Sequence, residues 1–146
     1  MIKNRELHYS TSSEIKLFQE ERLKETLRHL AEHSPFYKRM FDDNNINIDD
    51  IKTIEDLTKI PTTSKNDLQS NNADFICVDS VDIIDYVTTS GTLGEPVTFA
   101  LTDSDLQRLA YNEASSFTMA GCTKEDVMQL MTTIDRRFMA GLAYFM

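Results

Sequence analysis

The stretch IIDYVTTSGTLGEPVTFAL, residues 83–101, decides the fold of this 146-residue chain. Two apolar segments rich in β-branched residues, 83–88 and 97–101, are predicted to form strands. In the loop between them, Gly91 and Gly94 permit positive φ angles, so that successive backbone N–H groups can converge on an anion. Thr89, Ser90 and Thr92 add hydroxyl donors. The pattern predicts a phosphate-binding loop, with a simple turn between two strands as the alternative.

The loop differs from two common nucleotide-binding motifs. A Walker A motif needs Gly-Lys followed by Ser or Thr, and Pro96 occupies the position of its second glycine. The G-x-G-x-x-G fingerprint of dinucleotide-binding folds does not occur in the sequence. Another kind of phosphate loop is therefore expected.

Further segments of the chain resemble one family in the same order along the sequence. They are HSPFY at 33–37, DLTKIPTTSKNDL at 56–68, a T-x-x-D-L helix start at 102–106, an A-G-x-x-x-x-D-V connection at 120–127 and an F-x-x-G-L segment at 138–142. Together with the loop, they resemble phenylacetate–CoA ligases of the adenylate-forming (acyl-CoA ligase) superfamily. The resemblance covers most of the chain but only the N-terminal portion of the family's length.

The resemblance implies a fold, a reaction and a site. The expected fold is α/β: N-terminal helices, then β-loop-β-α-β-α, as the beginning of the large N-terminal domain of an adenylate-forming enzyme. Residues 1–70 would be a helical lead segment and 71–146 an α/β segment carrying the phosphate-binding loop 88–97. The whole enzyme would use ATP, Mg²⁺ and coenzyme A to convert a small carboxylic acid, expected to be aromatic, to an acyl-adenylate and then a thioester. The residues implied to bind the phosphates are Thr89, Ser90, Gly91, Thr92 and Gly94.

Three positions depart from the pattern that the resemblance suggests. Leu93 replaces a hydroxyl residue, Glu95 stands where the family often has lysine, and Val97 stands where the wider superfamily has lysine. A carboxylate beside a triphosphate would weaken binding by about 1 kcal/mol at a surface-like dielectric. Two alternatives therefore stay open: an adenylate-forming enzyme with another acyl acceptor, and a non-catalytic interaction or regulatory fragment of a truncated ligase.

Composition narrows the class of protein. Apolar content of 40% and charged content of 27% are typical of a soluble globular protein, and no apolar run approaches the length of a membrane span. The net charge of −9 argues against nucleic-acid binding. We expect a cytoplasmic protein whose partner is a small carboxylic acid, with a homodimer as a candidate assembly.

Cysteine and histidine spacing predicts no metal site. Cys77 and Cys122 are expected to be small buried residues rather than disulfide or zinc partners. His29 and His33 share a helix face, but no H-E-x-x-H signature accompanies them, so a surface or packing role is favoured.

Local signals predict the elements in detail. A capping box of Thr11 and Glu14 begins a helix over 11–33, which Pro35 ends before a second helix at 36–41. Short helices are expected at 53–57, capped by Thr53, and at 63–69, capped by Thr63 or Ser64. Strands are expected at 75–78, 83–88, 97–101 and 127–131. Thr102 is expected to cap a helix that stops at Gly121, and Asp135 to cap a last helix. The apolar end at 138–146 and the family's greater length predict that the natural protein continues.

Overall fold

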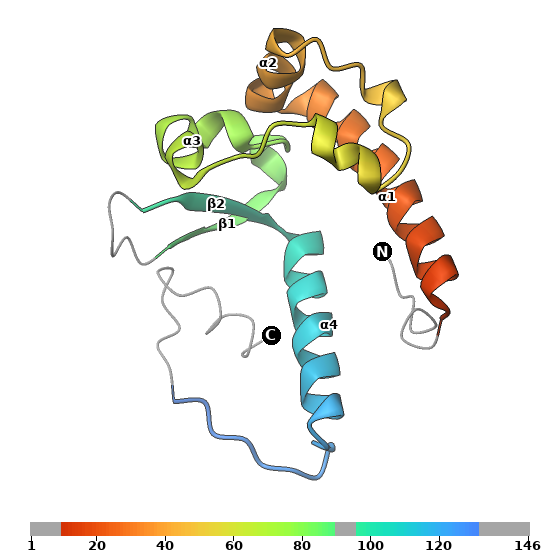
Figure 1. Cartoon of the computed structure of the whole chain (residues 1–146). Coiled ribbons are helices and arrows are strands. Elements are labelled where there is room, and N and C mark those ends of the chain that lie inside the picture. The colour runs from red at the N-terminus through yellow and green to blue at the C-terminus, as the bar shows by residue number, and fades with distance from the viewer. Residues whose placement is uncertain (1–9, 90–95, 132–146) are drawn as a thin grey trace. The chain divides into compact units, whose positions relative to one another are not determined.

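The computed structural model describes residues 10–89 and 96–131 (Figure 1). The chain divides into two compact units, residues 1–77 and 78–146. Helices make up the first unit, and the second contains a strand hairpin followed by a helix. The predicted division into segments 1–70 and 71–146 stays a prediction.

Two α-helices form the frame of the first unit. The first helix, α1 (Ser12–His33), begins at Thr11, whose side chain accepts the N–H of Glu14 while Glu14 binds the Thr11 N–H, so the predicted capping box is confirmed. The second, α2 (Pro35–Asp43), follows after one residue. Ser34 ends α1 by donating its N–H to the Leu30 carbonyl and caps α2 by accepting the Tyr37 N–H at 3.3 Å.

The remaining elements of this unit are short. They are η2 (Ile48–Asp50), η3 (Glu55–Lys59), α3 (Lys65–Ser70) and η4 (Asn72–Phe75). Ser64 caps α3 in a capping box with Asp67, which confirms the second of the two predicted caps. The helix predicted at 53–57 is instead a 3₁₀ turn that starts at Glu55 without a side-chain cap. Thr53 does not cap it, because its N–H and its hydroxyl both donate to the Asp56 carboxylate at 3.0 Å.

The core of the first unit lies where α1 and α2 meet the segment after them. Leu27, Phe41 and Ile51 are its buried apolar residues, with exposed fractions of 4%, 4% and 2%. Leu23 and Leu30 pack against them from α1, at the helical spacing that the sequence predicts. The apolar stripe of α1 is therefore this unit's main packing surface.

The second unit is built on a hairpin. After the turn η5 (Ser80–Asp82), β1 (Ile83–Thr88) pairs antiparallel with β2 (Thr98–Thr102). Val87 lies opposite Phe99 and Thr88 opposite Thr98, with a register irregularity near Ile83. Both strands agree with prediction to within one residue.

Helix α4 (Asp103–Met119) follows β2 directly (Figure 1). Thr102 and Asp105 form its capping box, and Gly121 follows its end with φ +93°, as predicted for a glycine stop. The apolar face of α4 is only partly covered: Leu106, Leu109, Ala110 and Phe117 are half-buried and Ala114 is exposed.

Two predicted strands are wrong. Residues 75–78 do not form a strand, because Phe75 ends η4 and its ring stacks on Phe36 with centroids 4.0 Å apart. Residues 127–131 have no regular structure, and Val127 is 99% exposed. Neither segment finds a strand to pair with among residues 10–89 and 96–131. The last helix, expected from Asp135, lies outside the described residues.

Candidate phosphate-binding loop

The β1–β2 hairpin holds the two ends of the predicted loop together. The Thr89 N–H donates to the Val97 carbonyl at 2.9 Å, and the Val97 N–H donates to the Thr89 hydroxyl oxygen at 3.0 Å. These two bonds extend the ladder by one step beyond the Thr88–Thr98 pair. The loop that connects Thr89 to Val97 therefore starts and ends at a fixed, closed stem.

Thr89 has a structural role that its sequence position did not reveal. Its hydroxyl oxygen accepts the amide of Val97, a residue only 2% exposed. A hydroxyl can accept one bond and still donate its own hydrogen. Thr89 is itself exposed, so this hydrogen is free to donate to a ligand that reaches the stem.

Pro96 and Val97 complete the stem on its other side. Pro96 has no N–H, and its ring restricts φ to the value of an extended or turn conformation. The Val97 side chain is buried, so a lysine here would bring a charge into an apolar environment. This chain uses position 97 for packing.

The other predicted phosphate-binding residues, Ser90, Gly91, Thr92 and Gly94, lie outside the described residues, as do Leu93 and Glu95. Their role in binding phosphate stays a prediction. The structure brings the loop's two ends to one place, which any phosphate-binding loop of this length requires.

The start of α4, at the opposite end of β2 from the loop, is occupied by its own side chains. Asp105 accepts the N–H and the hydroxyl of Thr102 at 3.0 and 2.8 Å, and Arg108 pairs with Asp105 at 3.0 Å. Asp103 lies in the same first turn. Two carboxylates make this helix start unfavourable for a phosphate, which leaves the loop as the candidate site in the second unit.

The motifs at 33–37 and 56–68 have structural roles in the first unit. The buried Ser34 hydroxyl donates to the Asp74 carbonyl at 2.9 Å, and the Tyr37 hydroxyl lies 3.3 Å from that of Thr63. The pKa of Asp56 is held well below its usual value by Lys59 and by the backbone N–H groups of Lys52 and Thr53. These motifs therefore fix turns and caps.

His29 and His33 lie one turn apart on α1. The rings of His29 and His33 lie 4.7 Å apart, and no group of three or more potential metal ligands occurs in the described part of the chain. Cys77 and Cys122 are free thiols, half-buried rather than fully buried as predicted. Burial raises the pKa of the Cys77 thiol.

Curated relatives match most of the chain. Phenylacetate–coenzyme A ligase from Escherichia coli is 35% identical over 114 residues, which is 77% of this chain and 26% of the relative. The enzyme of the same name from Thermus thermophilus is 31% identical over 122 residues, 83% of this chain and 27% of the relative. Over most of its length, the chain is therefore similar to a part of the phenylacetate–CoA ligases. It spans about a quarter of the length of these relatives.

Comparison with solved structures shows which fold this chain has. A 2-hydroxyisobutyryl-CoA ligase in complex with 2-HIB-AMP matches 91% of the chain at a TM-score of 0.82 and 23% identity, over 29% of that protein. Another structure of this ligase, with 2-HIB-AMP and CoA, matches 71% of the chain at a TM-score of 0.65 and 28% identity, over 23% of that protein. The fold is that of an adenylate-forming CoA ligase, as expected. No protein-family model matches the chain.

Among residues 10–89 and 96–131, every helix is too short or too polar to cross a bilayer.

Proposed function

We propose that this chain supplies the ATP phosphate-binding loop of an AMP-forming acid–CoA ligase. The carboxylate of the acid attacks the α-phosphorus of ATP, which gives an acyl-adenylate and releases pyrophosphate. The CoA thiol then attacks the acyl carbon and displaces AMP. The closed stem of Thr89 and Val97, in a chain similar to these ligases, is the observation that carries the proposal.

The proposed role of the loop is electrostatic. Phosphate oxygens carry negative charge that preorganised donors stabilise most effectively, because the donors need not reorient during the reaction. Ser90, Thr92 and the amides of Gly91 and Gly94 supply such donors, and the Thr89 hydroxyl hydrogen is available at the stem. By the family resemblance, Mg²⁺ would be held by residues outside these 146.

The nature of the acid and of the acyl acceptor is part of the proposal. Relatives at 31–35% identity are phenylacetate–CoA ligases, which supports a small aromatic acid and coenzyme A as substrates. A cytoplasmic location is also part of the proposal. An acceptor other than CoA is one alternative. A non-catalytic interaction or regulatory role is the other, favoured by the departures at Leu93 and Glu95 from the loop that the resemblance suggests.

A chimeric enzyme tests the proposal. Residues 1–131 of this chain would replace the matching segment of the Escherichia coli relative, and acid-dependent ATP–pyrophosphate exchange would be measured with phenylacetate. We expect Gly91→Val to abolish exchange, because a β-branched side chain resists positive φ and fills the space of a phosphate oxygen. Thr92→Ala should lower the rate roughly ten- to a hundredfold, the effect of one lost donor to a charged group.

Controls separate loss of the site from loss of the fold. Gly91→Ala is the matched control for size, and circular dichroism of each variant shows whether the chimera still folds. Glu95→Lys should tighten ATP binding if that side chain faces the triphosphate. Near-normal exchange in Gly91→Val would show that the loop is only a turn and would overturn the proposal. Adenylation without thioester formation would favour the other acceptor.

A further inference from the structure

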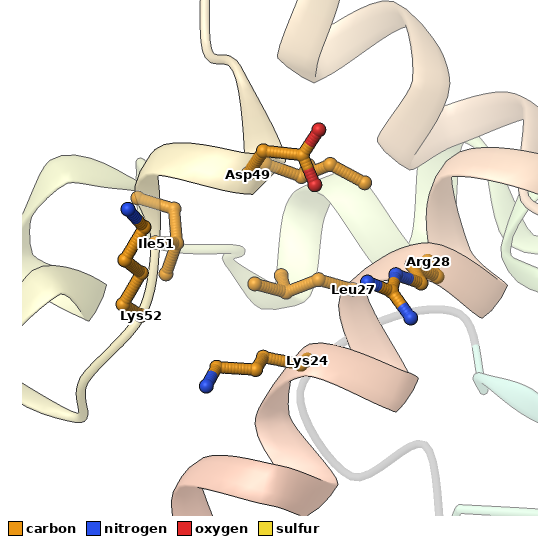
Figure 2. Close-up of a pocket in the computed structure, with 7 residues that line it drawn as sticks. Lys24, Leu27, Arg28, Asp49, Ile51 and Lys52 are labelled. Carbon is orange, nitrogen blue, oxygen red and sulfur yellow. The ribbon is translucent and has the colours of Figure 1, made fainter.

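A pocket of about 190 Å³ lies in the first unit, between α1 and the segment 48–52. Figure 2 shows Lys24, Leu27 and Arg28 on the helix and Asp49, Ile51 and Lys52 on the facing segment. All of these residues belong to one compact unit, and none belongs to the loop 88–97. The pocket is therefore separate in sequence from the candidate phosphate loop.

The base of this pocket is apolar. Leu27 and Ile51 are 4% and 2% exposed, and the half-buried Ile48 lies beside them in the lining. A cavity of about 150 Å³ lined by such side chains is large enough to hold benzene. The pocket can therefore accept a ring-sized apolar group.

Cations surround the apolar base. Lys24, Arg28 and Lys52 are all exposed, and none takes part in an ion pair of the described residues. Lys24 and Arg28 are four residues apart on one helix, where like charges are destabilising. In a chain with a net charge of −9, three cations without an ion pair among the described residues line this one pocket.

The net charge of the pocket lining indicates the charge of the expected ligand. Asp49 also lines the pocket, which leaves a formal local charge of +2 from the three cations and this single anion. A phosphate monoester carries about −1.5 to −2 at neutral pH, whereas a carboxylate carries about −1. The dianion matches the pocket better than the monoanion does.

We propose that this pocket binds a small organic phosphate monoester, with the phosphate between Lys24, Arg28 and Lys52 and a ring-sized apolar group on Leu27 and Ile51. The inference does not depend on the proposed ligase activity. It assigns to the first unit a ligand site of its own. Nucleotides and phosphorylated aromatic metabolites share the chemistry it recognises.

Phenyl phosphate is the probe that tests this assignment. Titration calorimetry and amide chemical shifts of the full chain should show binding on the order of 1 mM or tighter, with shifts centred on Leu27 and Ile51. Inorganic phosphate and phenol should each bind at least about tenfold more weakly, because each lacks one half of the ligand. Phenylacetate, which has the ring but a single charge, should also bind more weakly. Adenosine 5′-monophosphate tests whether a nucleotide is accepted as the source of the phosphate.

Two variants test the residues. Lys24→Gln and Lys52→Gln should each weaken phenyl phosphate binding about tenfold, as expected for the loss of one charge-assisted hydrogen bond. Lys38→Gln, at an exposed lysine on α2 outside the pocket, is the matched control and should leave the affinity unchanged.

Circular dichroism of each variant establishes that the helices are intact. Absence of binding to folded wild-type chain, equal affinity for inorganic phosphate or phenylacetate, or equal losses in Lys24→Gln and Lys38→Gln would each overturn the inference.

Discussion

Replacement of Thr89 by valine tests whether the hairpin stem is closed as described. Valine keeps the shape and β-propensity of threonine but removes the oxygen that accepts the Val97 N–H at 3.0 Å. An amide left without an acceptor in a buried residue costs about 1–3 kcal/mol. Because Thr89 is exposed and water can partly replace its hydroxyl, we expect the lower part of this range, about 1–1.5 kcal/mol, or roughly five- to tenfold in an equilibrium.

Amide hydrogen exchange measures this effect at the residue concerned. The Val97 amide should exchange roughly five- to tenfold faster in Thr89→Val than in wild type, whereas amides within α4 should be unchanged. Thr89→Ser retains the hydroxyl and serves as the matched control, with protection close to that of wild type. Equal protection of Val97 in Thr89→Val and Thr89→Ser would refute the reasoning, since the hydroxyl would then not hold the stem.

Three further predictions concern the chain as a whole. Ser34→Ala should lower the free energy of unfolding by about 1–3 kcal/mol in urea titration. This should be at least twice the effect of Ser64→Ala, because the Ser34 cap is buried and the Ser64 cap is exposed. The free energies of unfolding of wild type and Asp56→Asn should converge as the pH falls below 3.8, the ordinary pKa of Asp. Folding lowers the pKa of Asp56, so the ionised carboxylate stabilises the folded state above pH 3.8, and this contribution is lost as the carboxylate becomes protonated. The isolated chain should self-associate in sedimentation, because Val127 and Met131 are 99% and 85% exposed; a monomer at every concentration would count against this.

The caps and the hairpin were predictable because their signals are local. Thr11 with Glu14, and Thr102 with Asp105, satisfy helix N–H groups within three residues, so the pattern alone determines the helix start. The strands at 83–88 and 98–102 are joined by a short loop, and each supplies the partner that the other requires.

The failed predictions and the missed pocket depend on distant contacts. Residues 127–131 have strand-like composition, but a strand also needs a neighbour to pair with, and composition cannot supply one. Lys24 and Arg28 lie on an exposed face of α1, and the sequence of the helix does not distinguish them from its other charged residues. Only the fold of the segment 48–52 brings Lys52 and Ile51 opposite them. The spacing of residues along the sequence does not reveal that these two segments line one pocket.

The shared cap at Ser34 has a consequence for the order of folding. One residue ends α1 and begins α2 through hydrogen bonds to Leu30 and Tyr37, each at most four positions away. Contacts between near neighbours close small loops and cost little chain entropy, so they form early. During synthesis, this joint can assemble as soon as α2 leaves the ribosome, before β1 has been translated. The helical unit would then begin to fold before the hairpin and the rest of the polypeptide do.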